Sequence, residues 1–224
     1  GNVENAIPNL HAVVPLSKKA FFALGVTTPF GLATDFSNNS VTAYSGTKTQ
    51  ILSININPSL AYALSPHWSV GVGFDALYGA ADYDSNVFVG ATLPLKNHLT
   101  GWGYGYNLGM LYQPSNHTRF GLSYRSSISI DASGRSELGG LPSDTPGVVT
   151  TAKADLPLPA TTMLSYFHDV NSRWAVMASA FYSKWDVFRT LQLNNVANAN
   201  GSFAPAFPST IIDDKHFRNT WNYA

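Results

Sequence analysis

The residues of this chain whose types and spacing suggest enzymatic chemistry are few, and they form no catalytic arrangement. Gly101, Gly103 and Gly105 have the spacing of a nucleotide-binding fingerprint, but they alternate with aromatic residues and open no helix. The sequence contains no Gly-x-Ser-x-Gly elbow and no His-Glu-x-x-His motif. His67 and His117 fall in polar turns, where a solvated histidine is a more ordinary interpretation than a metal ligand. We therefore predict that the protein is not an enzyme and holds no cofactor and no metal.

Charge is scarce along the whole chain. The 224 residues include 13 basic and 13 acidic side chains, so the net charge is zero and only 12% of the residues are charged. Soluble domains average about 25%. The absence of Lys/Arg runs argues against a nucleic-acid partner. The absence of cysteine excludes disulfides, Cys-ligated zinc and thiol catalysis. No stretch of eighteen or more continuous apolar residues predicts a transmembrane helix.

Large apolar residues alternate with small or polar residues along most of the sequence. From Leu52 to Leu64 the even positions are large and apolar, apart from Pro58, and the odd positions are small or polar. A period of two is typical of a strand with one apolar and one polar face. Applied to the whole chain, the rule predicts nine strands, near residues 9–16, 20–30, 49–64, 67–80, 100–113, 118–131, 151–168, 172–186 and 216–224.

The connections between these strands alternate between short and long. Short polar turns at 17–19, 65–67, 115–117 and 169–173 recur about every fifty residues. The pattern predicts an antiparallel meander in which all the short turns lie at one end of the sheet. The long connections are expected near residues 81–99, 132–150 and 189–215, on the extracellular side if the short turns are periplasmic.

Three features favour a membrane barrel over a β-sandwich, which is the usual fold of a soluble all-β chain. The predicted strands are mostly longer than the usual five or six residues and match the length that crosses a bilayer. Aromatic residues bracket the short turns and recur toward the long loops, as at two membrane interfaces. The strand charges are expected on the face opposite the large apolar residues, namely Asp75, Arg119, Arg125, Asp131, Lys153 and Asp155. We predict an all-β, antiparallel up-and-down transmembrane barrel, with residues 1–224 forming part of a single domain.

Several segments then resemble one known family. Residues 25–36, GVTTPFGLATDF, resemble the third-strand signature of the long-chain fatty acid transporter (FadL-type) family of Gram-negative outer membranes. Residues 68–78, 101–112 and 122–126 resemble further segments of that family, in the same order. The resemblance implies an outer-membrane barrel of 14 strands, plugged by an N-terminal hatch, that takes up hydrophobic molecules by lateral diffusion through its wall. Because it places the hatch before Asn9 and further strands after Ala224, we expect this chain to be part of a larger barrel.

The segment Thr28, Pro29, Phe30 and Gly31 is the candidate lateral opening. Proline has no N–H to give to a neighbouring strand, so within a membrane strand it either opens a gap in the ladder or marks the end of the strand. Gly31 leaves the wall without a side chain. In the family, the corresponding bend forms an opening from the lumen to the bilayer. The alternative interpretation is that Pro29, Phe30 and Gly31 merely end the strand.

Ligand contacts are expected on the lumen face, where several side chains break its polar character. An apolar track for an acyl chain is one interpretation, and packing against a hatch is the other. The two inward arginines either pair with a substrate carboxylate or are neutralised by Asp75 and Asp131. Residues 79–84 are acidic here, whereas a known member of the family carries basic residues just after the matching strand, which weighs against carboxylate binding at that stretch. The candidate contacts are Leu77, Leu111, Arg125, Met163, Phe167, Met177 and Phe181.

The sequence thus predicts a passive conduit for long-chain fatty acids or other hydrophobic compounds. The expected partners are the hydrophobic small molecule, outer-membrane lipid and lipopolysaccharide, and the expected state is a monomeric barrel in the Gram-negative outer membrane. The alternatives are an uptake channel for aromatic hydrocarbons on the same fold and a surface adhesin or antigen. A lipid-hydrolysing barrel would need a Ser-His pair on the outward face, and none stands out.

Overall fold

The structure is a computed structural model that describes residues 9–29, 31–35, 47–88, 91–187, 190–198, 209–214 and 217–224. Within these residues the chain is almost entirely antiparallel β-sheet, with one short 3-10 helix, η1 (Trp185–Val187). No helix in this part of the chain is long and apolar enough to cross a membrane. The strands are β1 (Leu10–Pro15), β2 (Ala20–Thr27), β3 (Gly31–Asp35), β4 (Lys48–Ala63), β5 (Trp68–Phe88), β6 (Thr92–Ser115), β7 (Thr118–Arg125), β8 (Ile128–Leu138), β9 (Val149–Leu158), β10 (Thr161–Asn171), β11 (Trp174–Ser183), β12 (Thr190–Asn194), β13 (Ile211–Asp214) and β14 (Thr220–Tyr223).

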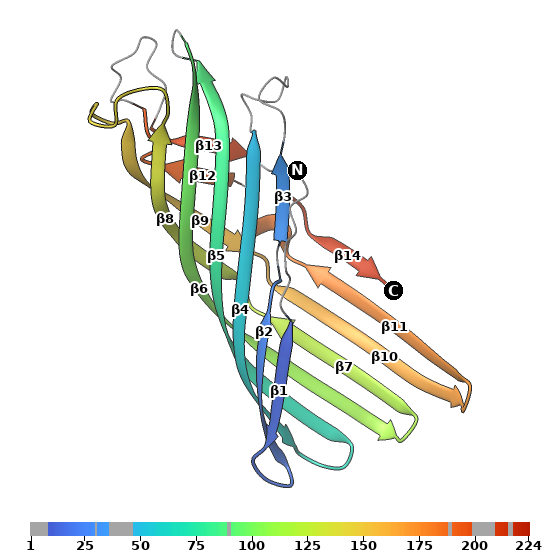
Figure 1. Ribbon diagram of the computed structural model, residues 1–224. Helices are drawn as coiled ribbons and strands as arrows, with labels where there is room; N and C mark the ends of the chain where they lie inside the picture. Colours follow the sequence, from blue (N-terminus) through green and yellow to red (C-terminus); the bar gives the residue numbers. More distant parts are fainter. Residues whose placement is uncertain are drawn as a thin grey trace.

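In the described residues these fourteen segments follow nine long paths across the sheet. The lower part has the order β1-β2-β4-β5-β6-β7-β10-β11-β14, and in the upper part β3, β8, β9, β12 and β13 continue the interrupted paths (Figure 1). The nine predicted strands and their antiparallel order are therefore confirmed. Five of the paths are interrupted, between β2 and β3, β7 and β8, β9 and β10, β11 and β12, and β13 and β14.

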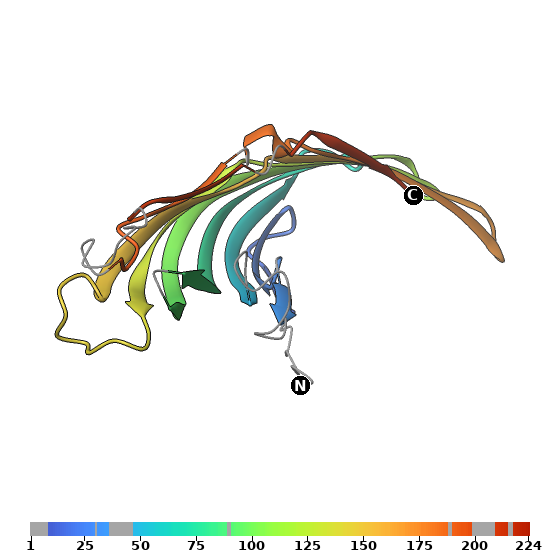
Figure 2. The same cartoon turned by 90° about the horizontal axis from the view of Figure 1, so that it is seen from above.

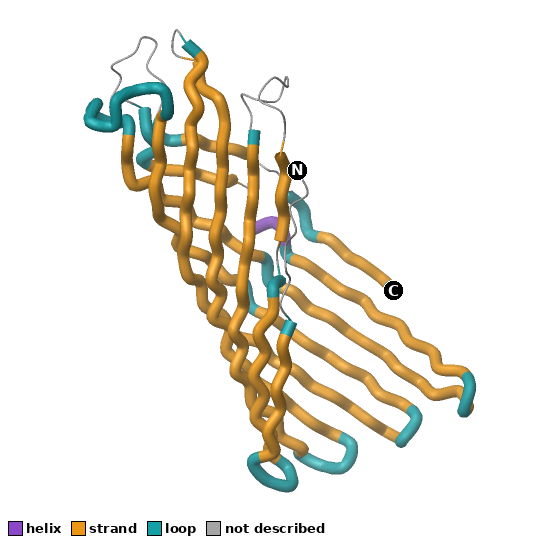
Figure 3. The backbone as a smooth tube through the Cα atoms, viewed as in Figure 1, coloured by secondary structure: helices purple, strands orange, loops and turns teal. Residues whose placement is uncertain are grey.

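The short turns all lie at one end of the sheet, at the bottom of Figure 1, as the sequence predicts. They connect β1 to β2, β4 to β5, β6 to β7 and β10 to β11, and Figure 3 shows each as a tight loop between two long strands. The predicted long loop at 81–99 is wrong. β5 runs on to Phe88 and β6 begins at Thr92, so most of that stretch is a hairpin that extends beyond the aromatic residues Tyr78 and Trp102.

One face of the lower sheet exposes a continuous apolar band between two aromatic belts. Trp68 stacks on Tyr112 with ring centroids 4.3 Å apart, and Phe120 and Tyr166 continue this belt near the short turns. Tyr78 and Trp102, 5.2 Å apart, mark the other belt. Between the belts lie exposed side chains from successive strands, namely Leu60, Val72, Leu108, Leu122, Leu164 and Val176. We call this the outward face and the opposite side the lumen face.

A register shift reverses the two faces halfway along two neighbouring paths. On β7, Arg125 pairs with Asn107 of β6, whereas on β8 Asp131 pairs with Trp102, so one extra residue separates the two registers. A one-residue slip moves every following side chain to the other face. Alternation counted along residues 118–131 predicts that Ile128 shares the outward face with Phe120 and Leu122, and this prediction is wrong. Ile128 lies on the lumen face and is 5% exposed.

The same shift corrects the predicted position of three charges. Asp131 lies opposite the outward Trp102, and Asp155 and Lys153 lie opposite Asp131 and Ser133 of β8. All three charged side chains are exposed, while Ala152 and Ala154 between them are buried. They stand on the outward face, not on the lumen face. These three charges lie at or beyond the belt marked by Trp102. A charged side chain on the lipid-facing side costs only about 0–1 kcal/mol near the membrane interface.

The upper part of the sheet curls around a buried apolar core on its lumen face. This core joins Leu77 of β5, Leu95 and Leu99 of β6 and Leu138 of β8 to residues of the segment after β12. That segment, 195–198, crosses the inner side: the Ala197 N–H donates to Ser136 Oγ, which itself donates to Asn97 Oδ1. Seen from above, the described sheet is a strongly curved wall and not a closed ring (Figure 2).

Candidate functional site

The wall is interrupted at Thr28 and Pro29, between β2 and β3. Both strands pair with β4, but Thr27 faces Asn55 and Gly31 faces Leu52, so three residues on one side oppose two on the other. This is the geometry of a β-bulge, and Pro29 has no N–H for the ladder. The Thr28 hydroxyl oxygen is buried and has no hydrogen-bond partner among the described residues. Phe30 lies outside the described residues, and of Gly31 the structure describes only the backbone.

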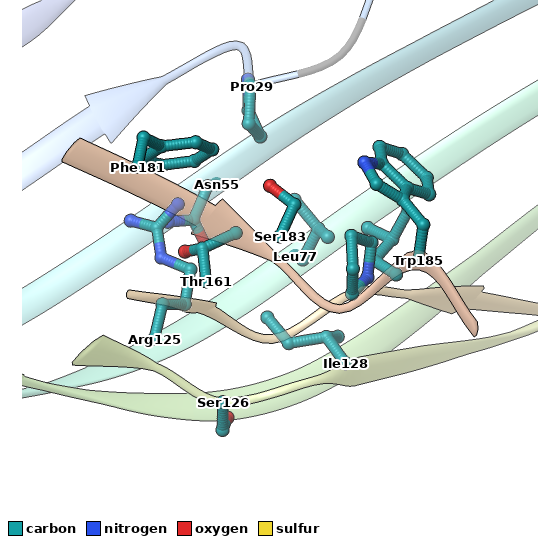
Figure 4. A pocket seen from close by; sticks show the side chains of 12 residues that line it. Pro29, Asn55, Leu77, Arg125, Ser126, Ile128, Thr161, Phe181, Ser183 and Trp185 are labelled. Atoms are coloured by element: carbon teal, nitrogen blue, oxygen red, sulfur yellow. The ribbon is translucent and has the colours of Figure 1, made fainter. Parts of the chain in front are cut away.

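A cavity of about 300 Å³ lies beside this interruption. Figure 4 shows Pro29 at the top of the cavity, with Phe181 to its left and Trp185 to its right. Ser126 and Pro159, from the breaks in two further paths, also line it. Five strands separate β2 from β11 in the order of the sheet. Residues next to β2 and β11 nevertheless line the same cavity. The sheet must therefore curve toward its lumen face at the height of the strand breaks.

A buried polar network borders the cavity. Asp75 is 0% exposed, and Asn55 Nδ2 donates to its Oδ1 at 2.6 Å and Asn107 Nδ2 to its Oδ2 at 2.8 Å. Asn57 Nδ2 adds a longer bond of 3.2 Å. The Arg125 guanidinium lies 3.5 Å from the same carboxylate, and its side chain is 40% exposed. Asp75 is thus satisfied mainly by neutral amides, with an ion pair to Arg125, so the predicted neutralisation of Arg125 by Asp75 is present.

The predicted ligand-contact residues share the lumen face but fall into two groups. Leu77, Arg125 and Phe181 line the cavity, Leu77 almost fully buried. The other group, Leu111, Phe167 and Met177, lies nearer the short turns, where the Arg119 guanidinium sits 5.4 Å from the Phe167 ring. Met163 lies between the groups, since it pairs with Phe181 and lines the same hollows as Leu111 and Phe181. The side chains form a partly apolar strip down the inner wall.

The fold and this site have clear counterparts among known proteins. The family described as outer membrane protein transport protein (OMPP1/FadL/TodX) matches residues 2–224 of the chain. The chain belongs to this family. The family resemblance inferred from the sequence is therefore confirmed, and the protein is an outer-membrane β-barrel protein of a Gram-negative bacterium. Its outward apolar band is accordingly the surface that faces lipid.

Relatives of this chain include transport proteins and outer-membrane proteins. It is 33% identical to the long-chain fatty acid transport protein of Escherichia coli O6:H1, over 83% of this chain and 50% of the relative. It is 28% identical to outer membrane protein P1 of Haemophilus influenzae, over 84% of this chain and 47% of the relative. The chain spans about half the length of the curated relatives it matches.

Solved structures of the family share the fold. A Pseudomonas aeruginosa FadL homologue superposes with a TM-score of 0.83 at 21% identity, covering 96% of this chain and 54% of that structure. The Ralstonia pickettii toluene transporter TbuX superposes with a TM-score of 0.73 at 18% identity, covering 95% of this chain and 63% of that structure. These likenesses confirm the predicted all-β barrel architecture.

Several residues of the site are not predicted from the sequence. Alternation places Asn55 and Asn57 on the polar face, but it does not give the register that brings both against Asp75. Pro159 and Trp185 line the cavity at breaks in two paths that the sequence predicts as continuous strands, 151–168 and 172–186. Pro159 was an available signal, because proline interrupts a ladder. The described residues contain no group of three metal-ligating side chains close enough to hold an ion.

Proposed function

We propose that the protein carries long-chain fatty acids or similar hydrophobic molecules across the outer membrane. The passage is passive diffusion without a cofactor, and it leaves the lumen sideways through the wall of a monomeric barrel. Membership of the OMPP1/FadL/TodX family supports transport of hydrophobic compounds. The observation that carries the lateral route is the interruption at Thr28 and Pro29, which lies directly beside a cavity on the lumen face.

The chemistry of the interruption fits an exit. A hydrophobic molecule crosses a barrel wall only where the ladder of backbone bonds is broken and no side chain fills the gap. Pro29 removes one donor and the bulge removes the regular pairing, while Gly31 adds no side chain. The strip of Leu111, Met163 and Phe181 supplies apolar contacts that lead along the lumen face toward this position. Weak apolar contacts suit a transport channel, because the transported molecule must dissociate from each contact in turn.

The test is uptake of labelled oleate by cells that carry the full-length protein with Gly31→Arg. A long charged side chain at the edge of the gap, where β3 begins, is expected to reduce uptake to the level of cells without the protein, while Gly31→Ala keeps most of it. The amount of folded barrel in the outer membrane is measured for each variant. Normal uptake through a correctly assembled Gly31→Arg barrel would contradict the lateral route.

An aromatic-hydrocarbon channel is the second candidate. The observation that favours it is the stretch 79–84 beyond Tyr78, which contains no basic residue to attract the carboxylate of a fatty acid. A neutral hydrocarbon needs no such basic residue. Cells carrying the protein are offered labelled toluene and labelled oleate in parallel. Uptake of toluene alone would establish the hydrocarbon channel and exclude the fatty acid route.

A further inference from the structure

In the part of the chain that the structure describes, the hydrogen-bond network around the buried Asp75 leaves one acceptor unpaired, the Asn55 side-chain oxygen. A carboxylate accepts hydrogen bonds only, so the Asn55 amide must turn its NH₂ group toward Asp75. Its oxygen Oδ1 then points away, and this atom is buried with no hydrogen-bond partner among the described residues. Asn55 is 2% exposed and lines the cavity beside Pro29. An orphaned buried acceptor costs about 1–3 kcal/mol, so a donor at this position would be stabilising.

Arg125 offers the complementary chemistry at the same place. A guanidinium has five N–H donors, and one terminal nitrogen of Arg125 reaches the Asp75 carboxylate at 3.5 Å. The side chain is 40% exposed and lines the same cavity as Asn55. Both residues reach the same carboxylate oxygen, Asp75 Oδ1, so they lie close together (Figure 4). Charged donors and an unsatisfied acceptor therefore meet at one wall of an otherwise mainly apolar cavity.

The glycine at position 73 makes this arrangement possible. A Cβ at Gly73 would lie 2.6 Å from Asn107 Oδ1, closer than real Cβ atoms approach, and 3.0 Å from Asn57 Nδ2, tighter than most real Cβ contacts. The missing side chain lets both amides close over Asp75. Three amides donate to the Asp75 carboxylate, which contacts only one terminal nitrogen of the Arg125 guanidinium. Asp75 therefore does not use all the N–H donors of Arg125. Asp75 is thus a positioning residue for Arg125.

We propose that Arg125 and Asn55 form a recognition site for the carboxyl head group of an acyl-chain substrate. One carboxyl oxygen accepts from Arg125, and the acid hydroxyl, or a water carried by the carboxylate, donates to Asn55 Oδ1. The chain then lies against Phe181 and Leu77, which line the same cavity. This inference rests on the proposed transport function and narrows its substrate class to carboxylic acids. A neutral hydrocarbon would leave both polar groups unused.

The site is built to bind weakly. Asp75 already neutralises much of the Arg125 charge, so an incoming carboxylate shares the guanidinium with a fixed carboxylate. A conduit needs binding that is favourable enough to admit the cargo and weak enough to release it. The site also stands beside the wall interruption at Pro29, where a head group held at Arg125 would place the substrate at the exit.

The test compares binding of oleate, oleyl alcohol and toluene to the purified full-length protein and its Arg125→Gln variant. Oleate binding is expected to weaken about tenfold, the scale of one charge-assisted hydrogen bond, while oleyl alcohol and toluene binding stay unchanged. Arg125→Lys is expected to recover part of the oleate affinity. Arg135→Gln is the matched control and is expected to leave oleate binding unchanged, since Arg135 lies on the outward face of β8, paired with Glu137 and away from the cavity.

Other outcomes overturn the inference in different ways. An equal loss for oleate and oleyl alcohol in Arg125→Gln would mean that Arg125 only supports the wall. Unchanged oleate binding would mean that the head group lies elsewhere. If the wild-type protein binds toluene but neither oleate nor the alcohol, the fatty acid function itself fails, and the head-group site fails with it.

Discussion

The side chain of Ile130 on β8 lies over the backbone of Gly79 on β5, although β6 runs between these two strands. A Cβ at Gly79 would stand 2.8 Å from Ile130 Cδ1. Ile128 lies in the same way over Gly103 of β6, where a Cβ would stand 2.6 Å from its Cγ2. These close approaches follow from the register shift, which turns both isoleucines from the outward face to the lumen face. Packing against β8 therefore accounts for Gly79 of β5 and Gly103 of β6, and the glycines near Gly103 are not a nucleotide fingerprint.

The first prediction concerns these packed glycines. Gly103→Ala is expected to destabilise the barrel by about 1–3 kcal/mol, because the new methyl group would overlap Ile128 and the Ser129 carbonyl. Gly109→Ala is the matched control on the same strand and face, since among the described residues only its own chain neighbours lie within 4 Å of a Cβ there. Urea unfolding of the full-length barrel in lipid vesicles measures both. Equal stability of the two variants would contradict the packing assigned to Ile128.

Local alternation predicts the strands of this fold well but not its interruptions. A strand with one face in lipid and one in the lumen must alternate, so nine paths and the apolar band follow from residue order. A bulge adds one residue without changing composition, and Ser126 and Ser127 look like any polar pair in a strand. Alternation counted through Ser126 and Ser127 therefore predicts the wrong faces for Ile128 and Asp131. The sequence does not predict the cavity either, because the cavity depends on the curvature of the sheet.

The second prediction tests which face meets lipid. Leu108 is exposed on the outward face between the aromatic belts, opposite Val72 and Tyr124. Leu108→Arg is expected to destabilise the barrel by roughly 2–4 kcal/mol, the cost of a cation near the bilayer midplane. Ser123→Arg places the same charge on the lumen face of the next strand path and is expected to cost far less. Comparable losses in vesicle unfolding experiments would mean that the two faces are wrongly assigned.

The third prediction is a pH dependence at Asp84, which lies beyond the aromatic belt toward the Phe88 end of β5. Burial raises the pKa of the Asp84 carboxyl above its ordinary value of 3.8, although Lys96 and Lys48 oppose the shift. The folded protein then binds the proton more tightly than the unfolded chain does. Stability falls as pH rises from 3.8 through the raised pKa, and the destabilisation is fully present at higher pH.

Replacing Asp84 by Asn removes this ionisation. The Asp84→Asn variant is expected to be more stable than the wild type at pH 7, with the difference shrinking as the pH falls and vanishing below 3.8. Unfolding midpoints of both proteins across this range give the comparison. A difference that stays constant with pH would show that the substitution acts through packing and not through the carboxyl proton.

The last prediction concerns the segment 195–198 that crosses the inner side of the upper sheet. Ser136 is fully buried; its hydroxyl donates to Asn97 Oδ1 at 2.7 Å and accepts from the Ala197 N–H at 2.9 Å. Ser136→Ala would leave both groups buried and unpaired, at a cost of about 1–3 kcal/mol each if the segment stayed in place. Detachment of the segment lets water satisfy them, so we expect local opening rather than loss of the whole barrel.

Hydrogen exchange at the Ala197 amide measures this opening directly. Exchange there is expected to rise strongly in Ser136→Ala, while amides in the lower strands, such as Leu164 and Val176, keep their protection. Ser133→Ala is the matched control, because Ser133 is exposed on the opposite face of the same strand. If Ala197 exchanges equally in both variants, the segment is held by its apolar contacts through Val196 and not by the Asn97–Ser136 pair.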